Sequence, residues 1–322
     1  MSAKLIQLGN CPYCSKPLGD INAFRLLQEN IGVQAVNAGD VCSECDRPMD
    51  LIDPLVQLNK DIKQAAIALK QAEVRFLVDY YYQMQKNRIR SKLQSDRSTE
   101  GNEPGLVLDW VMGNSRKLEN NIRAVLSTYT DSNLIGRWSK SIVGIGPVIA
   151  AGLLAHIDIE KAPTVGHIWR FAGLDPTLPQ RQQKGVKSPY NTRLKTLCWK
   201  IGESFVKVHN KTEDVYGHLY MQRKGLEIEQ NDIGMYAAQA EHKLATTNIG
   251  KETEAYGYYS QGKLPPAHLH ARAKRYTVKI FLSHWHHVAF EISTGGKPPV
   301  APYVISHLGH VDYIPPPNWP MD

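Results

Sequence analysis

The sequence predicts a mostly α-helical protein with a small metal-binding module at its N-terminus. Three features lead to this prediction: two CxxC motifs in the first 45 residues, a heptad repeat of apolar residues from about residue 55, and a long apolar segment at 134–157 that contains a glycine turn. We expect four parts: a zinc ribbon at 1–52, a long helical arm with its return helix at 53–130, a basic domain built on a helical hairpin at 131–210, and a helical extension with a proline-rich C-terminal tail at 211–322.

Length and composition are those of a soluble globular protein. The chain has 322 residues, of which 42% are hydrophobic, enough to bury a substantial core. Neither the N-terminus nor any later stretch has an apolar run long enough for a signal peptide or a membrane span. Four of the five cysteines fall into CxxC pairs, which fits a reducing compartment. We therefore expect a cytoplasmic protein without a membrane partner.

The two CxxC motifs have the pattern of a structural zinc site. Cys11 and Cys14 are separated by 27 residues from Cys42 and Cys45, and each pair is followed by a basic residue and a proline two and three positions later. Four thiolates complete a tetrahedral Zn²⁺ site and leave no open position for catalysis. The alternatives are a redox pair or unliganded cysteines.

A heptad repeat predicts a long coiled-coil-like helix after Asp53-Pro54. Leu55, Ile62, Leu69 and Phe76 recur every seven residues, and the pattern predicts a helix of roughly forty residues that ends near Asp96. A helix of this length needs a partner. It either pairs with a second chain or folds back on the helix at 105–130, and we favour a homodimer through residues 55–76.

The segment LIGRWSKSIVGIGPVIAAGLLAHI, at residues 134–157, predicts two helices joined by a tight turn. Gly144-Ile145-Gly146 allows the turn, and Pro147 suits the first position of the following helix. The N-terminus of that helix presents free N–H groups, a typical phosphate site. This is the pattern of a helix-hairpin-helix, which grips a nucleic-acid backbone; the alternative is a plain αα-hairpin with a glycine turn.

Positive charge is concentrated around this hairpin. Residues 136–210 hold eleven Lys/Arg and four Asp/Glu, an excess of seven charges that equals the net charge of the whole chain. A basic excess confined to one segment indicates a nucleic-acid partner, with duplex DNA favoured. The expected DNA-binding residues are the backbone of Gly144, Ile145 and Gly146 and the side chains of Arg137, Lys140, Lys184, Lys187, Arg193 and Lys195.

The remaining segments predict further helices. Asn191 is a candidate cap for a helix whose apolar positions include Leu194, Cys198 and Phe205, so Cys198 is expected in the core. A buried helix of some two dozen residues is expected to start at Pro265-Pro266 and to form a helical cover. The proline-rich tail after it is expected to lie extended over the surface.

The hairpin, the helix ending in FAGLDP, the basic loop and NTRLKTLCWKIGESFVK together resemble the C-terminal transposase domain of the bridge-RNA-guided, serine-type insertion-sequence family. The resemblance covers about residues 131–210. It implies a RuvC-like N-terminal domain, a coiled coil, and a nucleophilic serine in a Ser-Gly pair shortly after GLxP. Here that span reads TLPQRQQKG and has no serine, and a zinc ribbon stands in place of the acidic domain. The nearest hydroxyls are Thr177, Ser188 and Tyr190.

Histidines near the C-terminus offer a further possibility. His268-Leu-His270 with Tyr276 matches the pattern of single-strand nickases, but that pattern requires a central strand and this segment has helical character. A second group could hold a metal, although histidines on a helix are more often packed against their neighbours: His284, His286, His287, His307 and His310.

The sequence therefore favours a DNA-binding protein derived from a transposase, with a regulatory, architectural or element-maintenance role rather than catalysis. Two alternatives remain open. One is an active transposase, recombinase or nuclease with a displaced nucleophile at Ser188 or Tyr190. The other is an RNA-binding scaffold, because members of the family that it resembles handle a guide RNA.

Overall fold

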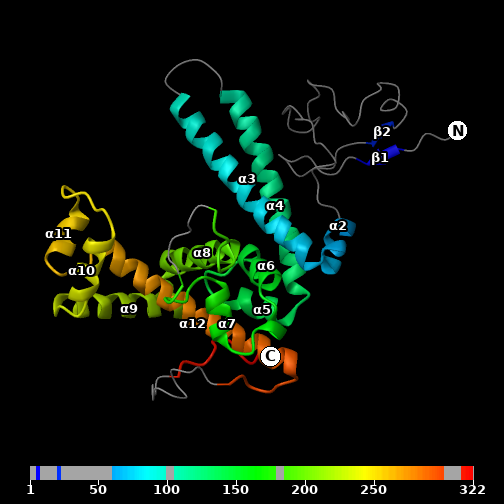
Figure 1. The fold of residues 1–322 in the computed structure, drawn as a ribbon. Helices are drawn as coiled ribbons and strands as arrows, with labels where there is room; N and C mark the ends of the chain where they lie inside the picture. Colours follow the sequence, from blue (N-terminus) through cyan, green and yellow to red (C-terminus); the bar gives the residue numbers. More distant parts are fainter. Residues whose placement is uncertain are drawn as a thin grey trace. The chain divides into compact units, whose positions relative to one another are not determined.

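The computed structural model describes residues 5–7, 20–22, 60–98, 105–178, 185–300 and 313–321, and most of them are helical (Figure 1). This confirms the mostly α class. The N-terminal part contributes one antiparallel pair, β1 (Leu5–Gln7) and β2 (Asp20–Asn22), with Ile6 opposite Ile21. The first CxxC motif falls in the connection between these strands, and all four candidate zinc ligands lie outside the described residues.

The helices follow in chain order. They are α2 (Lys60–Ala65), the 3₁₀ turn η2 (Ala66–Ala68), α3 (Gln71–Ser98), α4 (Gly105–Asp131), α5 (Leu134–Ser141), α6 (Pro147–His156), the 3₁₀ turn η3 (Ile159–Lys161), α7 (Val165–Phe171), α8 (Thr192–Val208), α9 (Val215–Asp232), α10 (Ala237–Thr246), α11 (Glu254–Ser260) and α12 (Pro266–Thr294). No helix among the described residues is both long and apolar enough to span a membrane.

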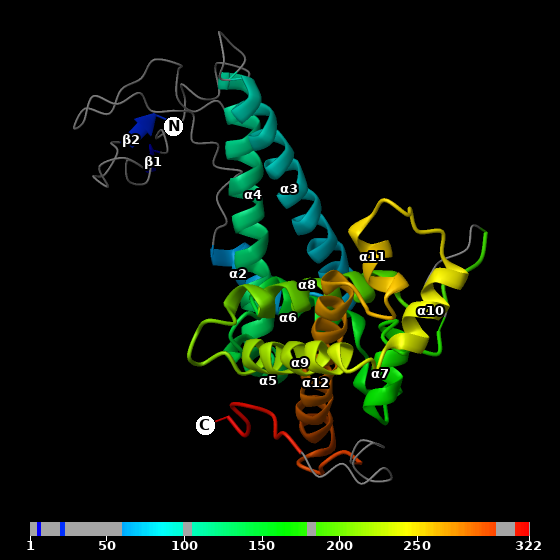
Figure 2. The same cartoon turned by 90° about the vertical axis from the view of Figure 1, so that its left-hand side faces the viewer.

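The chain forms two compact units, and each is described separately. One unit contains residues 1–64 and 84–121, and the other contains residues 65–83 and 122–322. In the first unit, residues 84–98 of α3 and residues 105–121 of α4 run side by side (Figures 1 and 2). Arg88 on α3 donates to Glu119 on α4 over 2.6 Å. The helix at 105–131 thus folds back along α3, and homodimerisation stays a prediction.

The prediction of one helix from residue 53 to residue 96 is wrong. The chain leaves the helix after η2, because Leu69 is extended at ψ 133°, and α3 then begins at Gln71. The carboxylate of Glu73 accepts a hydrogen bond of 2.8 Å from the N–H of Lys70, which is half of a capping box and fixes a new helix start. Because the helix is interrupted between Ala68 and Gln71, the heptad positions Ile62 and Phe76 do not lie on one continuous helical seam, and both side chains are exposed.

In the second unit, α12 runs through the centre of the core. It packs on α5, α7, α8 and α9, and Figure 2 shows α9 lying across it. Phe281 of α12 stacks on Trp138 of α5 at 6.2 Å between ring centroids and meets Tyr216 of α9 edge-on at 5.3 Å. The apolar core of the hairpin is therefore completed by a helix from the far end of the sequence.

The C-terminal helix starts where the sequence predicts, and the tail after it is described only in part. The buried helix begins at Pro266, as the sequence predicts, and runs to Thr294. Described tail residues 313–321 lie against the core without helix or strand. Trp138 donates its indole N–H to the carbonyl of Pro317 over 2.8 Å, and Trp319 donates to Glu291 over 2.6 Å. These bonds hold the tail against α5 and α12.

Candidate nucleic-acid interface

The helical hairpin has the boundaries that the sequence predicts. α5 ends at Ser141, and α6 begins at Pro147 with Gly146 as its N-cap. Gly144 adopts φ +92°, in the region that favours glycine, and the N–H of Ile145 donates to the carbonyl of Ile142 over 2.9 Å. The turn is therefore closed by its own backbone, and α6 starts immediately after it.

Helix α8 holds this turn in place. Ser204 Oγ donates to the carbonyl oxygen of Gly144 over 2.5 Å. A Cβ atom at Gly144 would lie 3.2 Å from Val208 Cγ2 and 3.3 Å from Ser204 Oγ. The side chain of Ile145 is buried in the core. Gly144 and Ile145 thus fix the turn to the protein interior.

Gly146, in contrast to Gly144 and Ile145, is not held against the protein interior. It is exposed, its φ of −91° suits any residue, and a Cβ atom placed there would meet no described atom within 4 Å beyond its chain neighbours. Within the described residues, the N–H groups of Gly146, Val148 and Ile149 make no hydrogen bond. A helix start with free N–H groups and unobstructed access is an anion site by its geometry and dipole. Ile145 is excluded as a donor because its N–H is already used.

Several basic side chains expected at the interface have protein partners. Lys140 contacts Asp131 over 2.7 Å and Ser127 over 2.8 Å, and Arg137 donates to the carbonyl of Asp131 over 2.9 Å. Arg193 forms an ion pair with Asp79 of α3. Acids outside 136–210 thus neutralise part of the local charge excess, which a count within that segment cannot detect.

Of the other expected DNA-binding cations, Lys195, Lys187 and Lys184, the two that the structure describes are not paired with a carboxylate in the described chain. Lys195 lies over the ring of Tyr190 with its Nζ 4.1 Å from the centroid. Lys187 is exposed and has no ion-pair partner within the described chain. Lys184 lies outside the described residues. The set therefore divides into paired, stacked and free side chains rather than forming one surface.

Sequence reasoning missed one cation near the hairpin. Lys207 is exposed and sits three residues after Ser204 on α8. Residues three and four apart share a helix face, so Lys207 lies on the face that contacts the Gly144 turn. Its proximity depends on the packing of α8 against the hairpin, and helical spacing within 192–208 gives no sign of it.

The candidate nucleophiles occupy a structural turn. Ser188 Oγ accepts a hydrogen bond from the N–H of Tyr190 over 3.4 Å. The Tyr190 ring packs so tightly on Gly173 that a Cβ atom there would lie 2.8 Å from Tyr190 Cγ. In the described part of the chain, neither hydroxyl has a hydrogen bond to a carboxylate or an imidazole that could act as a general base.

The histidine pattern of nickases is not formed, because His268 and His270 lie on α12 rather than on a strand. His268 contacts the hydroxyl of Tyr259 over 3.1 Å, and His270 contacts that of Tyr220 over 2.7 Å. Each imidazole is thus held by a neighbouring tyrosine.

The described histidines of the second group, His284, His286 and His287, each bond to different partners. His284 bonds both to Tyr216, over 2.7 Å, and to the carbonyl of Ile314, over 2.8 Å. His286 bonds to the carbonyl of Ala162 over 2.7 Å, and His287 pairs with Glu291. The described residues hold no cluster of three potential metal ligands. His307 and His310 lie outside them.

The described residues form a helical protein with an open helix N-terminus at a tight hairpin. Residues 138–216 match the family model described as the Transposase IS116/IS110/IS902 family. This is about a quarter of the chain, and it runs from α5 to the first turn of α9. No curated protein matches, and no solved structure matches. The chain thus contains a transposase-like segment, which supports a transposase-derived function involving nucleic acid.

Proposed function

We propose that this protein binds duplex DNA through the α5–α6 hairpin, which acts as a helix-hairpin-helix and grips the phosphate backbone. One observation carries the proposal: Gly146 opens α6 at an exposed position, and a Cβ atom added there would have no described atom within 4 Å apart from those of its chain neighbours. A phosphate oxygen needs this access to reach the free N–H groups of the first helical turn. Such contacts carry no base information, so binding is expected to be independent of sequence.

The surrounding cations supply the long-range attraction. Lys207 and Lys187 are exposed and unneutralised within the described residues, and Lys207 shares a helix face with the residue that anchors the turn. Lys140 contributes less, because Asp131 holds its ammonium group at 2.7 Å. The proposed grip is therefore centred on the α6 N-terminus and Lys207, with Lys187 and Lys184 as further contacts.

The N-terminal module is proposed to be a structural zinc ribbon. The antiparallel pairing of β1 and β2 on either side of Cys11 and Cys14 supports this, because CxxC motifs of zinc ribbons lie at such turns. The ribbon would use all four cysteines and leave no site for chemistry.

We propose a regulatory, architectural or element-maintenance role in preference to strand transfer. The tyrosine packing on Gly173 and the absence of a base at Ser188 in the described region support binding without a nucleophile. Catalysis by Ser188 or Tyr190 is the second candidate. A scaffold for RNA is the third, because the resemblance to guide-RNA-dependent transposases extends over the same hairpin.

Two assays separate these functions. In the first, a labelled duplex is competed with unlabelled duplex and with a structured RNA of equal length, and the proposal expects the duplex to compete better. Preference for RNA would favour the scaffold. In the second, a supercoiled plasmid is incubated with Mg²⁺ or Mn²⁺. Nicking that Ser188→Ala or Tyr190→Phe abolishes would contradict the binding-only role.

A further inference from the structure

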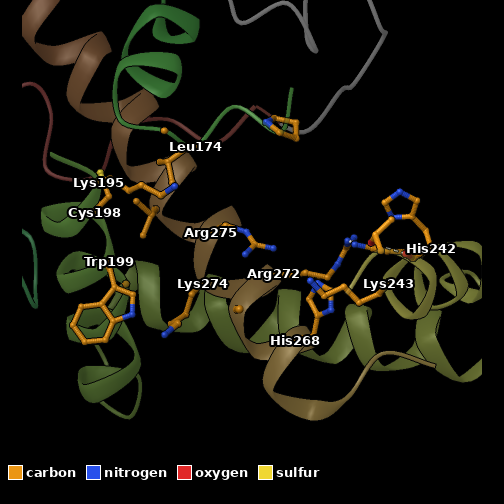
Figure 3. Close-up of a pocket in the computed structure, with 17 residues that line it drawn as sticks. Leu174, Lys195, Cys198, Trp199, His242, Lys243, His268, Arg272, Lys274 and Arg275 are labelled. Atoms are coloured by element: carbon orange, nitrogen blue, oxygen red, sulfur yellow. Dashed lines mark hydrogen bonds between the residues drawn. The ribbon is translucent and has the colours of Figure 1, made fainter. Parts of the chain in front are cut away.

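A cavity of about 800 Å³ lies between the transposase-like segment and the helices that follow it. Figure 3 shows Trp199 and Lys195 on one side, Lys243 and His268 on the other, and the α12 arginines between them. The lining comes from the loop after α7 and from α8, α10 and α12. All of these elements belong to the second unit. The volume is in the range of small-molecule and cofactor sites.

The lining is strongly cationic. It includes five Lys/Arg side chains and no Asp or Glu: Lys195, Lys243, Arg272, Lys274 and Arg275. Two of the five are neutralised from outside the lining, Arg272 by Glu227 over 2.6 Å and Lys274 by Glu203. None of the ion pairs among the described residues involves Lys195, Lys243 or Arg275. Like charges gathered in a concave site repel one another, and an anion would relieve that repulsion.

Of these three side chains, Arg275 has the donor geometry best suited to an anion. Arg275 is exposed, and none of the five N–H donors of its guanidinium has a hydrogen-bond acceptor within the described structure, so these donors are open to a ligand. Partial desolvation by the cavity wall, followed by the positive charge of Arg272, lowers the pKa of Arg275. A planar fork of donors without a protein acceptor is suited to a bidentate oxyanion such as phosphate.

His268 lies in the same cavity as these cations. Burial lowers the pKa of His268 to about 4, and the charges of Arg275, Arg272 and Lys243 act in the same direction. The cations of α10 and α12 therefore act on one point of the cavity. His268 itself stays neutral at physiological pH and adds no charge.

The cavity also offers an aromatic surface. Trp199 lies on α8 beside the buried Cys198, yet 60% of its surface is exposed. Lys274 lies over the indole ring with its Nζ 5.7 Å from the centroid. An exposed indole at the edge of a cationic cavity is a stacking platform for a nucleobase, and every base can stack on it.

We propose that this cavity binds one unpaired nucleotide of a single-stranded nucleic acid. The phosphate group contacts Arg275 and Lys243, and the base stacks on Trp199. The proposal rests on the proposed function only in taking nucleic acid as the partner, because the duplex grip uses different residues at the start of α6. Together the two sites suit a nucleic acid that has a duplex part and an unpaired part.

The test uses the full-length protein and a 3′-labelled single-stranded DNA 12-mer in a fluorescence-anisotropy titration. Base stacking on an aromatic side chain strengthens single-strand binding by roughly five- to a hundredfold. We expect Trp199→Ala and Arg275→Gln each to weaken binding about tenfold. Lys251→Gln, an exposed change of equal charge outside the cavity, controls for Arg275→Gln and should leave the affinity unchanged. Circular dichroism and thermal melting establish that each variant is folded.

Two further arms identify the ligand. Displacement of the 12-mer by deoxyadenosine monophosphate but not by inorganic phosphate supports base recognition and adds free nucleotides as a source. Equal displacement by inorganic phosphate, with no effect of Trp199→Ala, would overturn the nucleotide assignment. Wild-type affinity for the 12-mer in folded Arg275→Gln and Trp199→Ala would overturn the site itself.

A hairpin variant separates the two proposals. Gly146→Asp should weaken duplex binding and leave the 12-mer affinity within a factor of two, whereas Arg275→Gln should do the reverse. If Gly146→Asp leaves duplex binding intact, only the hairpin grip fails. If both pocket variants bind the 12-mer normally, only the nucleotide site fails.

Discussion

Ser204 on α8 donates a 2.5 Å hydrogen bond to the carbonyl oxygen of Gly144 and so ties the hairpin turn to the core of the protein. Gly144 and Gly146 are one residue apart, yet they have different roles. Gly144 needs its positive φ and has close neighbours, whereas Gly146 has an ordinary φ and open space around it. This difference makes folding and ligand binding separable by mutation.

Gly144→Ala should destabilise the protein by about 1–3 kcal/mol, because a Cβ atom is strained at this φ and would lie 3.2 Å from Val208. Ser204→Ala should cost about 1 kcal/mol through the lost hydrogen bond. Urea denaturation followed by circular dichroism measures both. Gly146→Ala serves as the control and is expected to change stability much less. Equal losses at both glycines would show that the turn is not held as described.

Stability should fall as the pH is lowered from 6.5 towards 4. Burial lowers the pKa of His284 from 6.5 to about 4, so between these values the unfolded chain binds a proton that the folded chain does not. The free energy of unfolding then decreases by about 1.4 kcal/mol per pH unit for this group.

Urea titrations at pH 7, 6 and 5 measure this dependence. His284→Gln should be less stable than the wild type at pH 7, because it loses one of the two bonds to Tyr216 and Ile314, but its pH dependence should be shallower. An unchanged slope in the variant would show that His284 is not the group responsible.

The N-terminal module should carry about one zinc per chain, because four thiolates complete a tetrahedral site. Metal analysis of freshly purified protein tests this directly. Cys42→Ser should release the metal and leave duplex affinity nearly unchanged, since the proposed grip lies on other residues. Protein free of zinc as purified would contradict the ribbon.

The arm offers a test of self-association. Phe76 is 65% exposed and stacks on Tyr80 with 5.8 Å between ring centroids, which leaves an apolar surface on α3. If a homodimer forms through residues 55–76, Phe76→Glu should convert it to a monomer in light scattering at tens of micromolar. Gln83→Glu, an exposed change of equal charge on the same helix, is the control. A monomeric wild type would refute the dimer.

Local signals predicted the parts of the fold that local chemistry decides. Pro147 marks the start of α6, and Asn191 caps α8 by accepting hydrogen bonds of 3.0 Å from the N–H groups of Arg193 and Leu194. The break before α3 was not predicted, because the heptad pattern continues across it. At the break, the carboxylate of Glu73 accepts a hydrogen bond from the N–H of Lys70 and caps the new helix.

Features formed by distant segments could not be predicted in the same way. The cationic cavity joins Lys195, Lys243 and Arg275, which come from α8, α10 and α12. Their juxtaposition depends on how these helices pack, and periodicity within one helix says nothing about it. The pairing of Lys140 with Asp131 and of Arg193 with Asp79 has the same origin. A charge count within one segment therefore cannot show which of its cations are paired with acids from other segments.

The salt dependence of duplex binding by Gly146→Asp tests the central claim most directly. Aspartate is a favourable N-cap, so the variant should be at least as stable as the wild type, while its carboxylate would occupy the phosphate site and repel the ligand. Gly250→Asp places the same charge in an exposed loop where a Cβ atom makes only ordinary contacts, which controls for net charge.

For the wild type we expect log affinity to fall with log salt with a slope magnitude on the order of 3 to 6. Gly146→Asp should weaken duplex binding at least about tenfold and reduce that slope by roughly one or more, with Gly250→Asp close to wild type. Wild-type affinity and slope in a folded Gly146→Asp protein would show that the hairpin is only a packing turn.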